Sequence, residues 1–286
     1  MRLIVALSCG ILLTCAGCVQ QIAVSTMGSI VDDGFGALTE EQDLELAEQA
    51  LPANLKLIEV LLKNDPDDTR LLRLASEGYS SYALGFVEDD APDRARVFYL
   101  RGRDYALRIL RQDEALAKAL DGPLDPLKDE LAKRGKEDVP ALFWAAFGWG
   151  GYINLSLTDP YAIADLPRAE AIMVAVANVD STFYCDGADV FLGTLYGGRP
   201  RLLGGDPSRA KRHFERALRI NGGKFLMTYI YYARSYAVQQ QDEALFDELL
   251  TTVEQASLDI SPETRLANAI AKKKAELLKA KKADLF

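Results

Sequence analysis

Few side chains in this chain of 286 residues have the types and spacing that catalysis needs. His213 is the only histidine, so one chain cannot assemble a histidine-dependent triad or a multi-histidine metal site. Cys185 has no activating neighbour in the sequence and is expected to be a buried, inert thiol. The stretch GGRPRLLGGDPSRAK suits phosphate, but it lacks the G-x-x-x-x-G-K-S/T spacing and no strand is expected before it. We therefore expect no enzyme activity, no metal and no cofactor.

The arginines offer binding chemistry instead. Arg199 and Arg201 lie in the segment GGRPRLLGG, where paired glycines flank a stiff Arg-Pro-Arg core. A guanidinium group suits carboxylates, and exposed loops often carry binding groups. We expect Leu202 and Leu203 to hold the segment against the body while Arg201, with Arg199 beside it, faces a carboxylate of a partner or cargo. The alternative is that both arginines pair with acidic residues of the same chain.

Aromatic side chains gather in several parts of the sequence. Most such rings are core, yet they are more numerous than simple helix packing needs, so a lined cleft is the functional interpretation. Gly148, Gly150 and Gly151 lie within one of these groups, where they permit close helix approach or leave a hollow. Besides the two loop arginines, the candidates for ligand or partner binding are Tyr79, Tyr82, Phe86, Trp144, Trp149, Tyr152, Tyr196 and Tyr232.

Apolar residues recur at helical spacing along most of the chain, and runs with the alternation of strands are nearly absent. Asp-Pro and Ser-Pro pairs mark several helix starts, because the first residue can cap and proline suits the first turn. A capping box from Thr39 to Gln42 is expected to open the first long helix. The sequence predicts an all-α protein with helices near residues 42–63, 69–87, 93–111, 139–156, 167–178, 188–197, 207–220, 224–239, 242–256 and 262–283.

The helices near 188–197 and 207–220 carry both halves of a tetratricopeptide signature. The first has L-G-x-x-Y, in which glycine lets the partner helix approach, and the second has A-x-x-x-F-x-x-A. The residues that match are Leu192, Gly193, Tyr196, Ala210, Phe214 and Ala217. Weaker echoes elsewhere predict an array of degenerate tetratricopeptide-like hairpins, an α-α superhelix that buries its core by stacking.

The first residues have the pattern of an export signal. Arg2 precedes the apolar run LIVALSCGILL, which is too short to span a bilayer, and small residues lead to Cys18. This is typical of a bacterial lipoprotein, although Cys15 stands where the lipobox normally has leucine. We expect a signal peptide at 1–17, a tether at 18–38 lipidated on Cys18, and a helical domain at 39–286. A plain secretory signal cleaved nearby, or an uncleaved anchor, is the alternative.

Net charge and cysteine content exclude two further properties, nonspecific nucleic-acid binding and an intrachain disulfide. The chain has 33 Lys and Arg against 42 Asp and Glu, a formal net charge of -9, which argues against nonspecific nucleic-acid binding. If cleavage removes Cys9 and Cys15 and lipid occupies Cys18, only Cys185 is left, so no intrachain disulfide can form. Stability must then come from packing.

Three separated segments together resemble the T component of tripartite ATP-independent periplasmic (TRAP) transporters, the TatT family. They are DVPALFWAAFGWGGYINLSLTD, GGRPRLLGGDPSRAKRHFERAL and the ending ETRLANAIAKKKAELLKAKKADLF. The resemblance covers nearly the whole mature chain and implies an all-helical lipoprotein that forms a homotrimer with a pore or cleft. It also implies a periplasmic solute-binding protein, the P component, as partner, and a small hydrophobic or organic-acid cargo. It supplies no catalytic residues.

The leading hypothesis is therefore a membrane-anchored periplasmic adaptor that docks a solute-binding protein and holds or passes a small ligand. The alternative is a generic tetratricopeptide lipoprotein scaffold that binds peptides in envelope assembly. A third reading, an envelope hydrolase, has only scattered carboxylates in its favour. By resemblance to enterobacterial sorting, where aspartate after the lipidated cysteine favours the inner membrane, Val19 indicates the outer membrane.

Overall fold

The computed structural model describes residues 32–286 of the chain, so Cys18, Val19 and the expected signal peptide lie outside the described residues. Every regular element in the described part is helical, which confirms the predicted all-α class. The first half contains α2 (Leu44–Asn64), α3 (Thr69–Tyr82), α4 (Pro92–Leu110), α5 (Glu114–Asp121), α6 (Leu124–Leu131), α7 (Val139–Asn154), α8 (Pro160–Ala164) and α9 (Leu166–Val179).

The second half contains α10 (Phe183–Gly197), α11 (Pro207–Ile220), α12 (Met227–Tyr231), α13 (Val238–Gln240), α14 (Glu243–Gln255), α15 (Arg265–Ala280) and α16 (Lys282–Leu285). Two π-helical segments, η1 (Ala83–Val87) and η3 (Tyr232–Ala237), continue α3 and α12 without a break. The remaining short turns are 3-10 helices: η2 (Arg201–Leu203), η4 (Leu258–Ile260) and η5 (Pro262–Thr264).

Each predicted helix is present, and the structure adds α5, α6 and α8, which the sequence pattern did not predict. These helices have only eight, eight and five residues, too few for a repeating apolar face to stand out. The predicted capping box at Thr39 is wrong. Asp43 caps α2 instead, accepting from the backbone N–H groups of Glu45 and Leu46 at 3.0 and 3.1 Å.

The reason lies in the segment before α2. Residues 32–39 are already helical, and the Thr39 hydroxyl donates 2.7 Å back to the carbonyl of Gly36 at the end of that segment. Phe35 is buried, and its ring lies close to Gly78 of α3 and within the cluster that contains Leu55 of α2. The packed body thus includes residues before the expected boundary at 39.

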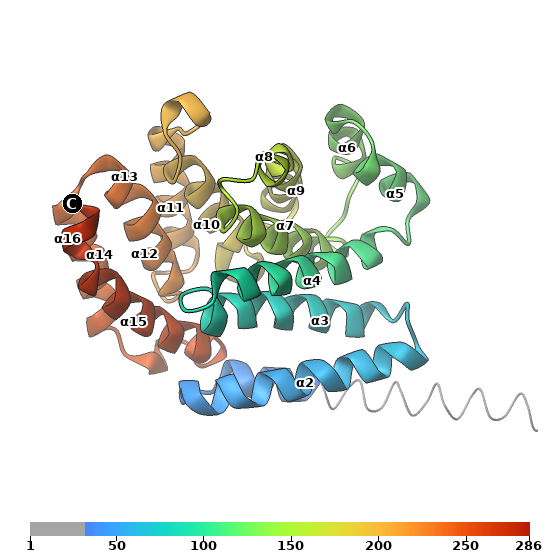
Figure 1. Cartoon of the computed structure of the whole chain (residues 1–286), viewed down its shortest axis with the longest axis horizontal. Helices are drawn as coiled ribbons and strands as arrows, with labels where there is room; N and C mark the ends of the chain where they lie inside the picture. The colour runs from blue at the N-terminus through green and yellow to red at the C-terminus, as the bar shows by residue number, and fades with distance from the viewer. Residues whose placement is uncertain (1–31) are drawn as a thin grey trace, which may run out of the picture.

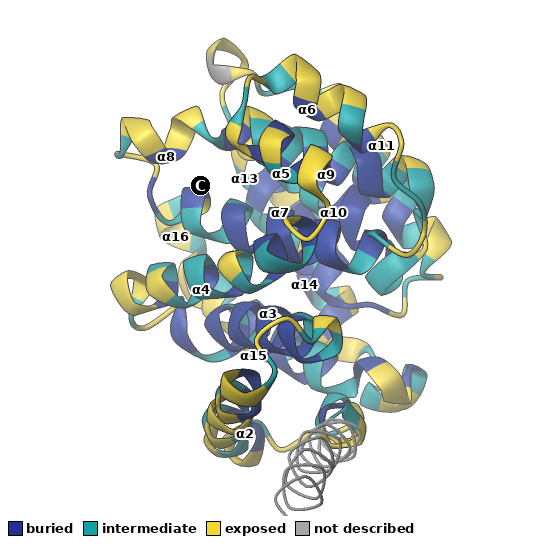
Figure 2. Cartoon of the chain, turned by 90° about the vertical axis from the view of Figure 1, so that its right-hand side faces the viewer, coloured by how far each residue is buried: buried dark blue, intermediate teal, exposed yellow. Residues whose placement is uncertain are grey.

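The helices stack side by side and then curl back (Figure 1). α3 packs on α4, α4 on α7 and α7 on α9, while α15 near the C-terminus returns to contact α2, α12 and α14. α7 is apolar on nearly every side, as expected of a helix enclosed by neighbours. In contrast, α2 keeps an exposed outer face (Figure 2). This arrangement leaves α7 and α10 at the centre of the molecule.

Glycine permits close helix crossings, as at Gly148 and Gly193. A Cβ placed on Gly148 would lie 2.7 Å from the carbonyl oxygen of Tyr99 and 2.8 Å from the amide nitrogen of Arg103, so α4 and α7 touch backbone to backbone. A Cβ placed on Gly193 would lie 3.0 Å from the ring of Phe214, which is the contact expected from the signature shared by α10 and α11.

Candidate functional site: an internal cavity

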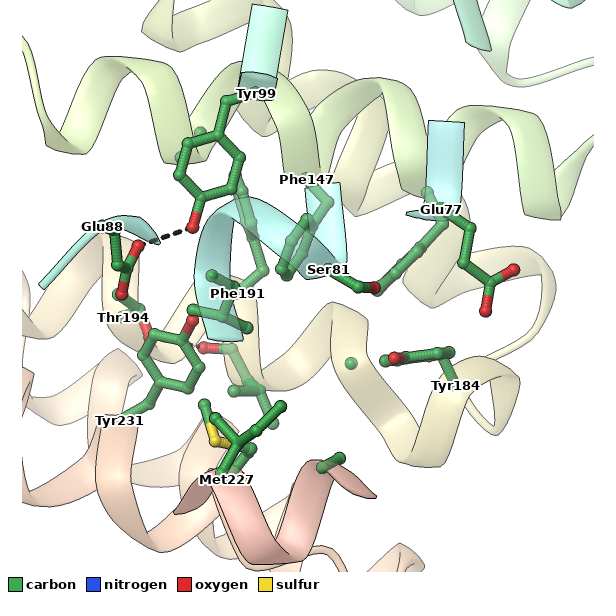
Figure 3. A pocket seen from close by; sticks show the side chains of 18 of the residues that line it. Glu77, Ser81, Glu88, Tyr99, Phe147, Tyr184, Phe191, Thr194, Met227 and Tyr231 are labelled. Carbon is green, nitrogen blue, oxygen red and sulfur yellow. Dashed lines mark hydrogen bonds between the residues drawn. The ribbon is translucent and has the colours of Figure 1, made fainter. Parts of the chain in front are cut away.

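A cavity of about 360 Å³ lies between α3, α7, α10, α12 and α15 (Figure 3). Its volume lies within the range of small-molecule sites, and most of its wall is apolar. Large wall residues include Phe143, Phe147, Tyr184, Phe191, Phe225, Met227, Tyr231 and Ile270. The wall therefore offers a large apolar surface interrupted by a few polar groups.

One face of α10 forms much of the wall. Its wall residues follow helical spacing from the first turn to the loop after the helix: Tyr184, Cys185, Gly187, Val190, Phe191, Thr194, Leu195, Gly198 and Arg199. The cavity therefore runs along this helix. Figure 3 shows Tyr184 and Glu77 on one side of it, and Thr194, Tyr231 and Glu88 on the other.

The facing wall comes from α7, where Phe143, Phe147, Gly150 and Gly151 share a side of the helix. Glycine is needed here because a Cβ on Gly150 would come within 2.3 Å of the Phe191 ring. The glycines of this helix thus serve both expected purposes. Gly148 permits close packing, whereas Gly150 and Gly151 border the hollow.

The first turn of α10 is strained. Tyr184, Cys185 and Asp186 adopt left-handed backbone angles, with φ of 49°, 58° and 61°, a conformation that costs free energy for residues other than glycine. The turn places Tyr184 and Cys185 in the cavity wall. Burial and the charge of Glu263 raise the pKa of the Cys185 thiol to about 11, so this thiol is protonated and unreactive at neutral pH.

This turn also contributes Asp186 to a buried pair of carboxyl groups, Asp186 and Asp189, both fully inaccessible to solvent. The Asp189 carboxylate lies 2.5 Å from Nδ1 of His213 and 3.3 Å from Nε of Arg216, both on α11. Burial and the neighbouring Asp189 raise the pKa of Asp186 to about 8, so Asp186 is neutral at pH 7. His213 therefore partners a buried carboxylate, a role consistent with the expected polar helix residue.

A buried ionic cluster borders the side of the cavity near Tyr231. Glu88 accepts hydrogen bonds from the Tyr99 hydroxyl at 2.5 Å and from Lys274 Nζ at 2.9 Å, and Arg234 lies 3.5 Å from it. Glu88 follows η1 directly and Arg234 belongs to η3, so both π-helical segments meet at this cluster. Such segments often occur at functional sites.

The side of the cavity near Tyr184 has two carboxylates and one cation. Glu77 lies in the wall and pairs with Arg73 at 3.2 Å, while Arg73 also pairs with Asp32 at 3.0 Å. Burial raises the pKa of Glu77, and the charge of Arg73 opposes that rise. One cation thus serves two carboxylates at this side.

The two arginines of the loop, Arg199 and Arg201, lie in different surroundings in the structure. Arg199 is half-buried in the cavity wall, where its Nε donates 2.8 Å to the carbonyl of Leu195, and burial lowers its pKa. Arg201 is exposed and lies outside the wall. The expectation that Leu202 anchors the loop is wrong because its side chain is 98% exposed. The side chain of Leu203 is not among those described.

Backbone hydrogen bonds help to hold this loop. The amide of Gly205 donates to the carbonyl of Pro200 at 3.1 Å, and the amide of Asp206 donates to that of Tyr196 at 2.9 Å. Gly204 has a φ of 85°, which lets the chain turn into α11.

The predicted aromatic candidates lie outside the cavity wall and mostly between helices. Tyr79 donates 2.6 Å to Glu59, and Tyr196 donates 2.5 Å to Glu170. Trp149 Nε1 donates 3.1 Å to Asp165. The rings of Tyr82 and Phe86 contact each other, Trp144 is buried in the core, Tyr152 packs at its edge, and Tyr232 stacks on Phe214. Their part in ligand or partner binding stays a prediction.

Sequence reasoning missed the wall residues Tyr184, Phe191, Tyr231 and Met227 as site candidates. A signal existed on α7, where Phe143, Phe147, Gly150 and Gly151 fall at one helical face with glycine in place of large side chains. No comparable signal marks Tyr184, because its position depends on a left-handed turn.

Across residues 32–286, no helix combines the length and apolarity needed to cross a bilayer. The same described residues contain no group of three or more His, Cys, Asp or Glu placed to hold a metal ion.

The fold and cavity define an all-helical protein with a largely apolar cavity among its central helices. The chain belongs to the family of TRAP transporter T-components, which it matches over residues 40–286. Membership makes it a component of a TRAP transporter, in a family not known for enzymes. It is also similar to an uncharacterized protein of Treponema pallidum (strain Nichols), with 27% identity over 306 residues covering 96% of this chain and 94% of that protein.

Proposed function

We propose that this protein is a membrane-anchored periplasmic adaptor of a TRAP transport system, which holds or passes a small hydrophobic or organic-acid ligand. The observation that carries this proposal is the apolar cavity of about 360 Å³ at the centre of a T-component. Its wall has the mixture of a large apolar surface and a few polar groups that small-molecule sites need.

The proposed partner is the solute-binding P component. The helical pairs, α10 with α11 above all, form a tetratricopeptide-like array in this proposal, and such arrays present extended binding surfaces. Arg201 and the exposed Leu202 project from the connection within that pair and are the proposed contacts, with Arg201 facing a carboxylate of the partner.

The proposed anchor is lipid on Cys18, with the residues that precede the helix at 32–39 as tether and the outer membrane as the expected location. We also propose a homotrimer, on the family resemblance. Light scattering of the purified protein tests it, and a monomer at high concentration would contradict it.

A peptide-binding scaffold is less well supported. The cavity has a volume in the range of small-molecule sites, whereas an extended peptide would bury a longer surface. The structure therefore favours the adaptor over the scaffold.

The decisive experiment is to purify the protein from its own cells and to analyse it by native mass spectrometry for a bound small molecule and a TRAP solute-binding protein. Val190→Phe adds volume inside the cavity, and Val97→Phe adds the same volume at an exposed site. We expect ligand to be lost from the first variant and kept by the second. Absence of both ligand and solute-binding protein from the wild type would contradict the proposal.

A further inference from the structure

A short helix at residues 32–39, which we call the N-terminal strap, precedes α2. Three of its residues contribute to the cavity wall and share one face of the helix at a spacing of three and four positions: Phe35, Leu38 and Thr39. Gly34 and Gly36 lie on other faces and are exposed, and no described atom lies within 4 Å of a Cβ added at either. Among the described residues, the strap therefore separates the cavity from solvent by the thickness of one helix.

A single buried side chain holds the strap to the body. Phe35 is 9% exposed, and it is the only buried residue of the strap. Its ring lies against Gly78 of α3, where an added Cβ would come within 2.8 Å of the ring, so the missing side chain of Gly78 leaves room for it. Burial of this one ring is the main contribution that keeps the strap docked.

The polar contacts of the strap are weaker. Asp32 pairs with Arg73 of α3 at 3.0 Å, but the two side chains are 41% and 32% exposed, so the pair contributes little. Just after the strap, Arg265 donates 3.2 Å to the carbonyl of Glu40. A helix of eight residues is not stable by itself in water, and the two glycines weaken it further. The strap therefore keeps its place only while it is docked.

The strap can move without disturbing α2. Residues 40–43 between them are not helical, and α2 has its own cap at Asp43. In the other direction the strap continues into the proposed tether, so a displacement of the tether reaches the strap before it reaches the body.

The covered side of the cavity is the one that contains Glu77. Arg73 pairs both with Asp32 of the strap and with Glu77 of the wall. Figure 3 shows Tyr184 on this same side, and Cys185 follows Tyr184 in the wall. The thiol of Cys185 therefore reports on access to the cavity from the side of the strap.

We infer, on the basis of the ligand-binding function proposed above, that the N-terminal strap is the gate of the cavity. In the closed state, Phe35 is seated on Gly78 and the strap covers the side near Glu77. In the open state, Phe35 leaves Gly78, the strap turns about residues 40–43, and the cavity meets solvent beside the point where the tether joins the body. Lids of this kind belong to the least stable parts of a fold, as the few contacts of the strap require.

Thiol labelling of Cys185 measures this opening without any ligand. N-ethylmaleimide is added to the purified protein, and mass spectrometry of the peptide that contains Cys185 gives the labelling rate. Phe35→Ala is expected to raise this rate by about tenfold or more, because loss of the buried ring increases the open fraction. The control Phe98→Ala removes the same kind of ring from the contact of α4 with α3, outside the cavity wall, and is expected to leave the rate unchanged.

The outcomes separate the gate from the function on which it depends. A Phe35→Ala protein that is labelled at the wild-type rate would overturn the inference. Equal acceleration in Phe98→Ala would also overturn it, because labelling would then report loosening of the whole fold. If Phe35→Ala alone is labelled faster while native mass spectrometry finds no small molecule on the wild type, the gate is right and the proposed ligand-binding function is wrong.

Discussion

The ammonium group of Lys274 on α15 lies 2.9 Å from Oε1 of Glu88 and 2.6 Å from Oδ2 of Asp89, which follow η1. The side chains of Lys274 and Glu88 are only 5% and 6% exposed, and 186 positions separate them in the chain. This contact fastens the C-terminal helices to the N-terminal half beside the cavity. A buried pair of this kind is costly to break because the remaining charge keeps its desolvation penalty.

Lys274→Met is therefore expected to lower the free energy of unfolding by about 3–5 kcal/mol, since Glu88 and Asp89 lose their shared cation. Urea denaturation followed by circular dichroism measures the loss. Lys273→Met, on the exposed side of the same helix, is the matched control and should change stability by less than about 0.5 kcal/mol. Equal stability of the two variants would show that the buried ion pair does not contribute to the free energy of unfolding.

Gly148→Ala is expected to lower the melting temperature, because its Cβ would press on the backbone of α4 at Tyr99 and Arg103. Overpacking of this kind costs about 1–3 kcal/mol. The control Gly36→Ala adds the same methyl group where nothing lies within 4 Å. Thermal unfolding that leaves Gly148→Ala as stable as Gly36→Ala would mean that the two helices can separate without cost.

The helical class and the long helices could be predicted because apolar spacing, Asp-Pro starts and the paired signature of Gly193 and Phe214 are local in sequence. The cap of α2 could not be chosen between Thr39 and Asp43 by pattern alone, since both precede an acidic helical run. Only the helix before Thr39, seen in the structure, decides the choice.

The cavity was harder to predict than the helices. Arg199 was identified from loop composition, yet Tyr79 and Trp149 match the same aromatic pattern and lie between helices with their polar atoms hydrogen-bonded. Whether a ring faces a hollow or a neighbouring helix depends on contacts between distant segments. Tyr184 reaches the wall through a left-handed backbone turn, and the residue types in that turn do not predict such a conformation.

Lipidation of Cys18 is a prediction from sequence. Mass spectrometry of the protein from cell membranes is expected to show an N-terminal cysteine carrying acyl groups. Cys18→Ser should shift the protein out of the detergent phase because it removes the thiol that carries the lipid, and with it the acyl chains that anchor the protein. A Cys18→Ser protein that still partitions wholly with membranes would contradict a lipid anchor.

The buried carboxyl pair predicts how stability depends on pH. Unfolded aspartate has a pKa of about 3.9, whereas folded Asp186 has a pKa of about 8 because of burial and the neighbouring Asp189. The folded state therefore keeps a proton that the unfolded state releases between these values. The contribution of Asp186 is full below about pH 4 and is lost as the pH rises through about 8, so stability falls across this window.

Asp186→Asn should flatten that dependence, because the amide stays neutral and asparagine tolerates a left-handed backbone as well as aspartate does. Asp189 contributes in the opposite direction and at lower pH: burial acts to raise its pKa, but His213, Asp186 and Arg216 lower it overall. Urea unfolding at several values between about pH 5 and about pH 9 measures the slope. The wild type and the exposed control Asp129→Asn should lose stability with rising pH more steeply than Asp186→Asn. Parallel profiles for all three proteins would place the proton on another group.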